Sequence, residues 1–148
     1  MLIKDRAGNV LIEMDETTQL DGAALRHADF SHLDLEGYDF SDTDLRESDC
    51  SGTTFYWTNF FRANCEGGIF LKARFCGAVL DFVNFRFANL DGAYISFDNL
   101  RSGCSLLGAD FSSANLEGAD LKGSRYNRET IFPAGFDPQS QGMLFVEK

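Results

Sequence analysis

Large apolar residues recur at every fifth position along most of this chain. The spacing runs from Leu20 to Leu100 and, after one additional residue, resumes from Leu106 to Tyr126. Of these 22 central positions, ten hold Leu and eight hold Phe, and two positions earlier 18 of the 22 residues are Ala, Gly, Ser, Thr or Cys. A period of five fits neither an α-helix nor a simple strand, whereas a solenoid stacks repeated residues in equivalent environments. Both positions are therefore expected to point inward, the large residue filling a lumen.

The clearest copies of the repeat are Ala109-Asp110-Phe111-Ser112-Ser113, Ala114-Asn115-Leu116-Glu117-Gly118 and Ala119-Asp120-Leu121-Lys122-Gly123. This motif, A-(D/N)-L-x-x, resembles that of the pentapeptide repeat proteins over about residues 18–131. The resemblance implies an all-β fold, a right-handed quadrilateral β-helix with four five-residue sides per coil. The 22 repeats then make about five and a half coils, and the 20-residue period stacks Leu100 on Leu80 and Phe111 on Leu90.

The whole chain, 1–148, is expected to form one domain with a cap at each end of the solenoid. In residues 1–16, two apolar runs around a Gly-Asn turn predict a β-hairpin. In residues 132–148, Asp137 is expected to cap one short helical turn before a final apolar run. The added residue lies within 101–105 and predicts a β-bulge, where Asp98 is expected to bond the backbone or turn outward.

Charge and hydropathy narrow the range of partners. The net charge is −10, with −9 in residues 1–50, zero in 51–100 and −1 in 101–148. Such acidity disfavours direct binding to nucleic acid or to an anionic membrane surface. No apolar run is long enough for a membrane helix and no signal peptide is recognisable at the start, so a cytoplasmic location is expected.

Candidate chemistry is scarce in this sequence. None of the four cysteines forms a C-x-x-C pair, and Cys50 and Cys65 stand at central positions, where buried thiols are expected. His27 and His32 lie one side of a coil apart and are expected to be solvated. No nucleophile–base motif, phosphate loop or dinucleotide fingerprint is present. The sequence therefore predicts no enzyme, no metal site and no cofactor.

Acidic residues and their amides precede many central residues. At these positions a short polar side chain can bond nearby backbone, which predicts a role in the turns rather than in recognition. The repeat uses either an acid or its neutral analogue, so shape matters more than charge: Asp29, Asp34, Asp39, Asp44 and Asp49, then Asn59, Asn64, Asn84 and Asn89.

Outward positions of the middle coils carry aromatic side chains. Exposed apolar patches with aromatic anchors are typical of protein interaction surfaces. Three interpretations stay open: the caps cover these side chains or they stack on the wall, they mediate self-association as a homodimer, or they bind a different protein. The candidate interaction residues are Tyr56, Trp57, Phe61, Phe82, Phe87, Tyr94 and Phe97.

The sequence predicts a non-enzymatic protein–protein interaction or scaffold module whose partner it does not identify. The resemblance implies an alternative, because some pentapeptide repeat proteins imitate duplex DNA with an acidic rod and thereby bind and protect the topoisomerase DNA gyrase. The neutral middle coils and the shortness of the chain disfavour that alternative. A purely structural role, which would tolerate changes on every wall, is the third possibility.

Overall fold

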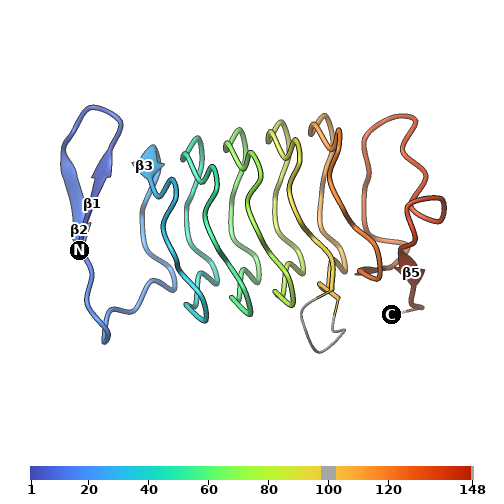
Figure 1. Cartoon of the computed structure of the whole chain (residues 1–148), viewed down its shortest axis with the longest axis horizontal. Coiled ribbons are helices and arrows are strands. Elements are labelled where there is room, and N and C mark those ends of the chain that lie inside the picture. Colours follow the sequence, from blue (N-terminus) through green and yellow to red (C-terminus); the bar gives the residue numbers. More distant parts are fainter. Residues whose placement is uncertain (98–102, 148) are drawn as a thin grey trace.

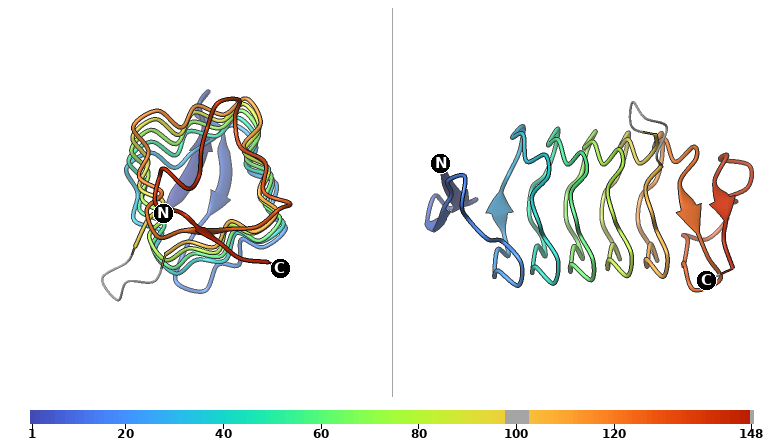
Figure 2. Two further views of the ribbon diagram at one scale, coloured as in Figure 1. Left: turned by 90° about the vertical axis from the view of Figure 1, so that its right-hand side faces the viewer. Right: turned by 90° about the horizontal axis from the view of Figure 1, so that it is seen from below.

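The computed structural model describes residues 1–97 and 103–147. The chain winds into a stack of coils with a hairpin at one end and the tail at the other (Figure 1). Viewed end-on, the coils superimpose as a four-sided column (Figure 2), which is the right-handed quadrilateral β-helix that the repeat predicts. Within the described ranges no segment forms a helix, so none forms a helix that could cross a membrane.

Each side of the column is a ladder of parallel backbone pairs between successive coils. We number the sides in chain order and define each by the outward residue just before its central residue. Face 1 contains Asp39, Asn59, Val79 and Ser105; face 2 contains Asp44, Asn64, Asn84 and Asp110; face 3 contains Asp29, Asp49, Ile69, Asn89 and Asn115; face 4 contains Asp34, Thr54, Arg74, Tyr94 and Asp120.

The central residues fill the lumen, as the sequence predicts. Their side chains are buried throughout the described coils. Phe rings stack between neighbouring coils, with centroids 4.9 Å apart for Phe40 and Phe60 and 5.1 Å apart for Phe55 and Phe75. The small residues two positions earlier also point inward, and the Thr43 hydroxyl donates to the Leu20 carbonyl of the preceding coil at 2.8 Å. Apolar burial and satisfied polar groups therefore both support the stack.

Each corner is a tight turn that starts at the central residue. The second residue after the centre takes a left-handed backbone conformation, as at Gly37, with a φ of 77°. Glycine suits such a turn because it has no Cβ. The acids and amides before each centre accept a hydrogen bond from the backbone N–H two residues ahead, as Asp29 Oδ1 does from Ser31 at 3.0 Å and Asn59 Oδ1 from Phe61 at 3.0 Å. Their predicted role in the turns is confirmed.

The break in the repeat differs from the expected single-residue bulge. Val79 pairs with Ser105 and Asn84 with Asp110, so the offset between coils rises from 20 residues to 26. Phe111 accordingly stacks on Phe85, with centroids 5.2 Å apart, and the predicted stacking of Phe111 on Leu90 is wrong. Backbone pairing resumes at Cys104-Ser105-Leu106, where a small residue and a Leu are again buried two positions apart. Leu100 and Asp98, with part of the expected bulge, lie outside the described residues.

The N-terminal hairpin closes one end of the column. β1 (Leu2–Asp5) pairs antiparallel with β2 (Val10–Glu13) on one side and with β3 (Ala28–Asp29) on the other. Ile3 and Met14 are buried against the lumen. The hairpin thus covers the open end of the first coil and is attached to it through β3 on face 3.

The C-terminal tail closes only part of the other end. β4 (Arg125–Tyr126) pairs in parallel with β5 (Leu144–Phe145), and Phe132 stacks on Phe111 with centroids 6.0 Å apart. Where the sequence predicts one capped helical turn, residues 138–142 form successive turns, and the Gln141 and Gly142 N–H groups donate to the Pro138 and Gln139 carbonyls. Asp137 caps this segment by accepting a hydrogen bond from the Gln139 N–H, although the segment is too short to form a regular helix.

Candidate protein-interaction surface

Three of the candidate aromatic residues occupy the left-handed corner position. The φ angles are 56° at Trp57, 59° at Phe82 and 60° at Phe87. A bulky residue in this conformation is strained, by roughly 1–3 kcal/mol. The neighbouring coils place glycine at the equivalent corner of Trp57, at Gly37 and Gly77. The large side chains are therefore not required by the turn, and they weaken it.

Most of the candidate side chains are open to solvent. The exposed fractions are 45% for Trp57, 47% for Phe82, 60% for Phe87, 46% for Tyr94 and 40% for Phe97. Tyr56 and Phe61 are half-buried. Neither the hairpin nor the tail covers the five exposed side chains, so stacking on the wall is the part of the first interpretation that stays open.

Two of the rings rest on glycines of the next coil. A Cβ added at Gly108 would overlap the Phe82 ring, and one added at Gly123 would overlap the Phe97 ring. Each ring therefore packs one side on the wall and presents the other to solvent. This packing fixes the orientation of the rings before any partner binds.

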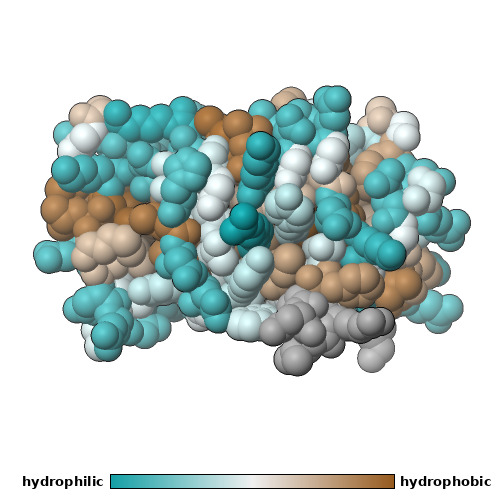
Figure 3. Space-filling view, in the orientation of Figure 1, coloured by the Kyte–Doolittle hydropathy of each residue, from teal (hydrophilic) through white to brown (hydrophobic). Residues whose placement is uncertain are grey.

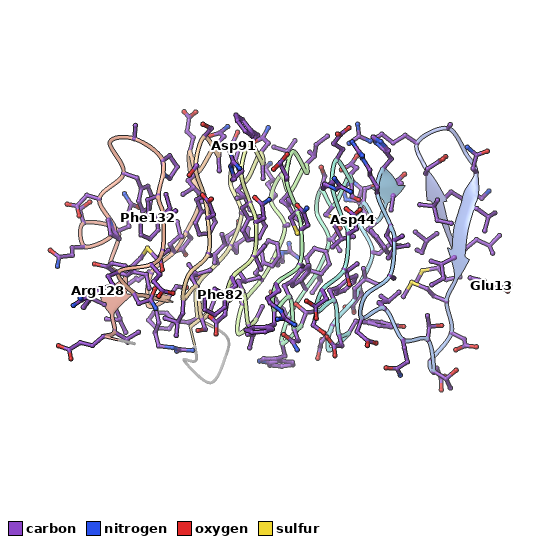
Figure 4. The ribbon with its side chains drawn as sticks, turned by 180° about the vertical axis from the view of Figure 1, so that it is seen from behind. Glu13, Asp44, Phe82, Asp91, Arg128 and Phe132 are labelled. Carbon is purple, nitrogen blue, oxygen red and sulfur yellow. The ribbon has the colours of Figure 1, made fainter. Side chains whose placement is uncertain are left out.

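Five apolar side chains gather around face 1. Trp57 and Phe97 belong to the corner before this face, Val79 lies on it with 39% exposed, and Phe61 and Phe82 belong to the corner after it. The rings of Phe61 and Phe82 meet edge to face with centroids 5.7 Å apart. Figure 4 shows Phe82 toward the lower side of the solenoid and Asp91 at the upper side. We call these five residues the face-1 surface.

Of the other three candidate residues, one lies beside the face-1 surface and two lie elsewhere on the wall. Tyr56 shares the corner of Trp57, with ring centroids 6.2 Å apart. Tyr94 lies on face 4, and Phe87 lies on the corner between faces 2 and 3, where the Arg86 guanidinium is 5.8 Å from its ring centroid. The seven aromatics thus do not form one continuous belt. The 20-residue register already places Trp57 and Phe97 in one corner column, with Phe82 and Phe87 on the next two corners, and the stacked coils have the same order.

The acidic coils are partly neutralised by arginines. The Arg26 guanidinium contacts Glu47 at 2.9 Å and Arg46 contacts Asp44 at 2.7 Å. These hydrogen bonds lower the pKa of Glu47 and the pKa of Asp44 below their ordinary values. Figure 4 places Asp44 on the wall of the early coils. These ion pairs balance two of the acids locally, and residues 1–50 keep their net charge of −9.

Two grooves border the ends of the solenoid, and sequence reasoning missed both. One, of about 380 Å³, lies at the N-terminal end of face 1 and is lined in part by Glu16, Glu36, Tyr38 and Asp39. The other, of about 460 Å³, lies between residues 114–119 of the last coil and residues 133–136 of the tail. Each groove forms between a coil and a segment outside the repeat, so no local motif marks it.

Candidate metal ligands are not clustered in the described chain. No group of three His, Cys, Asp or Glu side chains there could bind a metal ion. His27 and His32 are both exposed, and Cys50 and Cys65 are buried, as expected. Burial raises the pKa of Cys104 to about 12, so its thiol stays protonated at neutral pH.

Comparisons with known proteins agree with this architecture. A family model described as pentapeptide repeats matches eight copies over residues 23–60, 58–96 and 102–125. A pentapeptide repeat protein of the Arabidopsis thaliana thylakoid lumen is similar in structure, with a TM-score of 0.52 and 24% identity over 66% of this chain and 68% of that one. QnrB1, a plasmid-mediated fluoroquinolone resistance protein, is similar with a TM-score of 0.62 and 19% identity over 80% of this chain and 64% of that one. At these identities the two likenesses show the fold alone, and none of the curated proteins matches the chain in sequence.

Proposed function

Because the chain belongs to the pentapeptide repeat family, we propose that it is a non-enzymatic protein-binding module whose partner docks on the face-1 surface. The coils supply a rigid scaffold, since every side is tied to the next coil by backbone hydrogen bonds. The outward residues are free to vary without loss of the lumen. Function is therefore expected on the wall rather than in the core.

The observation that carries this proposal is the exposure of large aromatic rings at corners where other coils place glycine or polar residues such as Asp42 and Arg62. Trp57 and Phe82 occupy left-handed corners where glycine would be unstrained, and nearly half of each side chain is exposed. Neither feature favours the folded state. Large exposed aromatic residues concentrate at interaction surfaces, where a partner covers them.

The surface has the composition of a binding hot spot. Trp and other aromatic residues contribute a large share of binding energy when a partner covers them. Phe82 and Phe97 are already oriented by their glycine neighbours, so binding loses little side-chain entropy there. The half-buried Phe61 and the exposed Val79 extend the apolar area between the two corners.

The DNA-mimicking, gyrase-binding alternative has weaker support. It requires negative charge along the rod, whereas residues 51–100 are neutral. Arginines also pair with acids of the early coils. Supercoiling by gyrase is expected to be unchanged by the protein in vitro, and an inhibition or protection that disappears on neutralising Asp34 and Asp39 would favour the alternative.

Two glycine substitutions at corners of the same kind test the proposal. The parent protein, Trp57→Gly and Phe87→Gly are each immobilised and incubated with extracts of the source organism. The proteins that each of the three retains are then compared. Both variants remove an exposed aromatic side chain and relieve a left-handed backbone, but only the first alters the face-1 surface. We expect Trp57→Gly to lose a stoichiometric partner that the parent and Phe87→Gly both retain.

The same comparison contains the outcome that would refute the proposal. If the parent and Trp57→Gly retain the same proteins in the same amounts, the face-1 surface is not the docking site. If Phe87→Gly alone loses the partner, the site lies on the corner between faces 2 and 3. Circular dichroism of both variants confirms that each is folded before the comparison is made.

A further inference from the structure

The two ends of the solenoid carry exposed apolar residues in addition to those on the wall. At the N-terminal end, Leu2 is 51% exposed and Val10 is 55% exposed; at the C-terminal end, Leu144 is 54% exposed and Phe145 is 47% exposed. Figure 3 shows this apolar surface over the hairpin at the left end of the molecule. Polar side chains separate the two ends over much of the visible wall. Ends that are apolar in this way are candidates for contact with another chain.

Both ends of face 3 also present an unpaired strand edge. The face-3 ladder begins with β2 and β1 of the hairpin, continues through β3, and ends at Asn115 in the last coil. Among the residues that the structure describes, β2 pairs with β1 alone. Such an edge exposes a row of backbone donors and acceptors that can add a further strand.

The opposite end of this ladder lacks the bonds that earlier coils make. One coil earlier, Leu90 N–H donates to the Asn115 carbonyl, and the Ala88 carbonyl accepts from Asn115 N–H. In the described part of the chain, the equivalent groups of the last coil, Leu116 N–H and the Ala114 carbonyl, have no such partner. They line the groove of about 460 Å³ between the last coil and the tail. This groove is therefore a continuation of the coil–coil interface that a further strand would complete.

We propose that a second copy of this chain fills the groove, by pairing its β2 edge in parallel with the Asn115 segment of the last coil. β1 is antiparallel to β3 and to β2, so β2 runs in the same direction as the face-3 strands. Translation of one molecule along the solenoid axis therefore brings the two unpaired edges together with the parallel pairing that all coils use.

Charge favours contact between unlike ends over contact between two N-terminal ends. Residues 1–50 have a net charge of −9, whereas residues 101–148 have a net charge of −1. Pairing two N-terminal halves would place the most acidic coils against each other. Because the contact joins different surfaces by translation, it does not close, and the expected product is a linear chain of copies. Such a chain would repeat the face-1 surface along a rod and increase avidity for a partner with several sites.

Variants that block one end at a time test this arrangement. Leu11→Lys places a charge on the β2 edge, and Ala119→Lys places a charge in the groove. If Ala119→Lys fails to fold, Ala134→Lys, at an exposed residue that also lines the groove, replaces it. Ala24→Lys, on the exposed wall of face 2, is the charge-matched control. Sedimentation velocity measures the mass of each protein over a range of concentrations.

We expect the parent and the wall control to grow in mass with concentration without a fixed end point, and each end-blocked variant to remain a 16.5 kDa monomer. Mixing the two end-blocked variants leaves one free groove and one free β2 edge, so a 1:1 dimer and nothing larger is expected. Trp57→Gly should assemble like the parent, because the contact is independent of the face-1 surface.

Two results would overturn the inference. A parent that remains monomeric at the highest concentration excludes the contact. An end-blocked variant that still dimerises on its own shows that like ends associate instead. Neither result bears on partner binding at the face-1 surface, which the glycine variants test separately.

Discussion

Phenylalanine occupies two contrasting environments in this protein. In the lumen, Phe70 has none of its surface exposed and contacts Phe75 and Phe85, with centroids 5.7 and 5.5 Å away. On the corners, Phe82 and Phe87 are 47% and 60% exposed on a left-handed backbone. The same side chain therefore stabilises the fold in one place and strains it in the other.

The contrast separates residues that specify the solenoid from residues that specify its partners. A lumen position has neighbours in the coils above and below, so its identity is determined by packing. A corner position is satisfied by glycine and also accepts polar residues such as Asp42 and Lys72, so packing in the lumen does not determine its identity. The predictions below test this separation, beginning with the lumen.

The largest effect is expected from Phe70→Ala. The substitution leaves a cavity in the middle of a stacked column and is expected to lower the free energy of unfolding by roughly 3–5 kcal/mol. Denaturant unfolding followed by circular dichroism measures the change. A loss below about 1 kcal/mol would show that the lumen is not the main source of stability.

A smaller effect is expected where a corner ring rests on a glycine. Gly123→Ala is expected to lower the free energy of unfolding by roughly 2–4 kcal/mol, because it adds a Cβ to a left-handed residue and displaces the Phe97 ring. Gly22→Ala is the matched control, since its φ is also positive and its added Cβ would meet nothing within 4 Å. Equal losses in the two variants would contradict the packing of Phe97 on Gly123, and Phe97→Ala should reduce only the Gly123→Ala loss.

A still smaller effect is expected from the acidic turns. The Ser31 hydroxyl and N–H donate to Asp29 and lower its pKa below the ordinary 3.8. The charged form is therefore favoured in the folded state, so its contribution is present above pH 3.8 and is lost as the pH falls through the lower folded value. Asp29→Asn is expected to be slightly less stable at pH 7 and to lose less stability between pH 5 and about pH 2. Thermal unfolding at several pH values measures both slopes, and parallel curves would show that the Asp29 charge is irrelevant.

Most of the architecture was predictable from the sequence because the repeat encodes it directly. A central Leu or Phe every fifth residue identifies the lumen, and Asp29 or Asn59 before it identifies the turn. The hairpin could also be inferred, since Val10 and Leu11 follow a Gly-Asn turn. The lumen residues, the turns and the hairpin each depend on a short local pattern, and such patterns can be read directly from the sequence.

The break, the tail and the arrangement of the wall required the structure. The offset of 26 residues between coils follows from the pairing of Ser105 with Val79. Periodicity alone favours a shorter offset, because it counts Leu100 as one more central residue of the repeat. The two grooves form between segments that are distant in sequence, as between Leu116 and Phe136. The four-sided register places Phe87 and Trp57 on different corners, but how much of each side chain is exposed comes only from the structure.

The most direct test of the central claim is the free energy of unfolding of the Trp57→Gly, Phe87→Gly double variant, measured by denaturant titration beside the parent. We expect equal or greater stability, because two strained corners relax and no side chain is removed from the lumen. A loss of more than about 1 kcal/mol with an unchanged slope would contradict it. That result would mean that the corner aromatics are part of the packed wall and are retained for stability rather than for a partner.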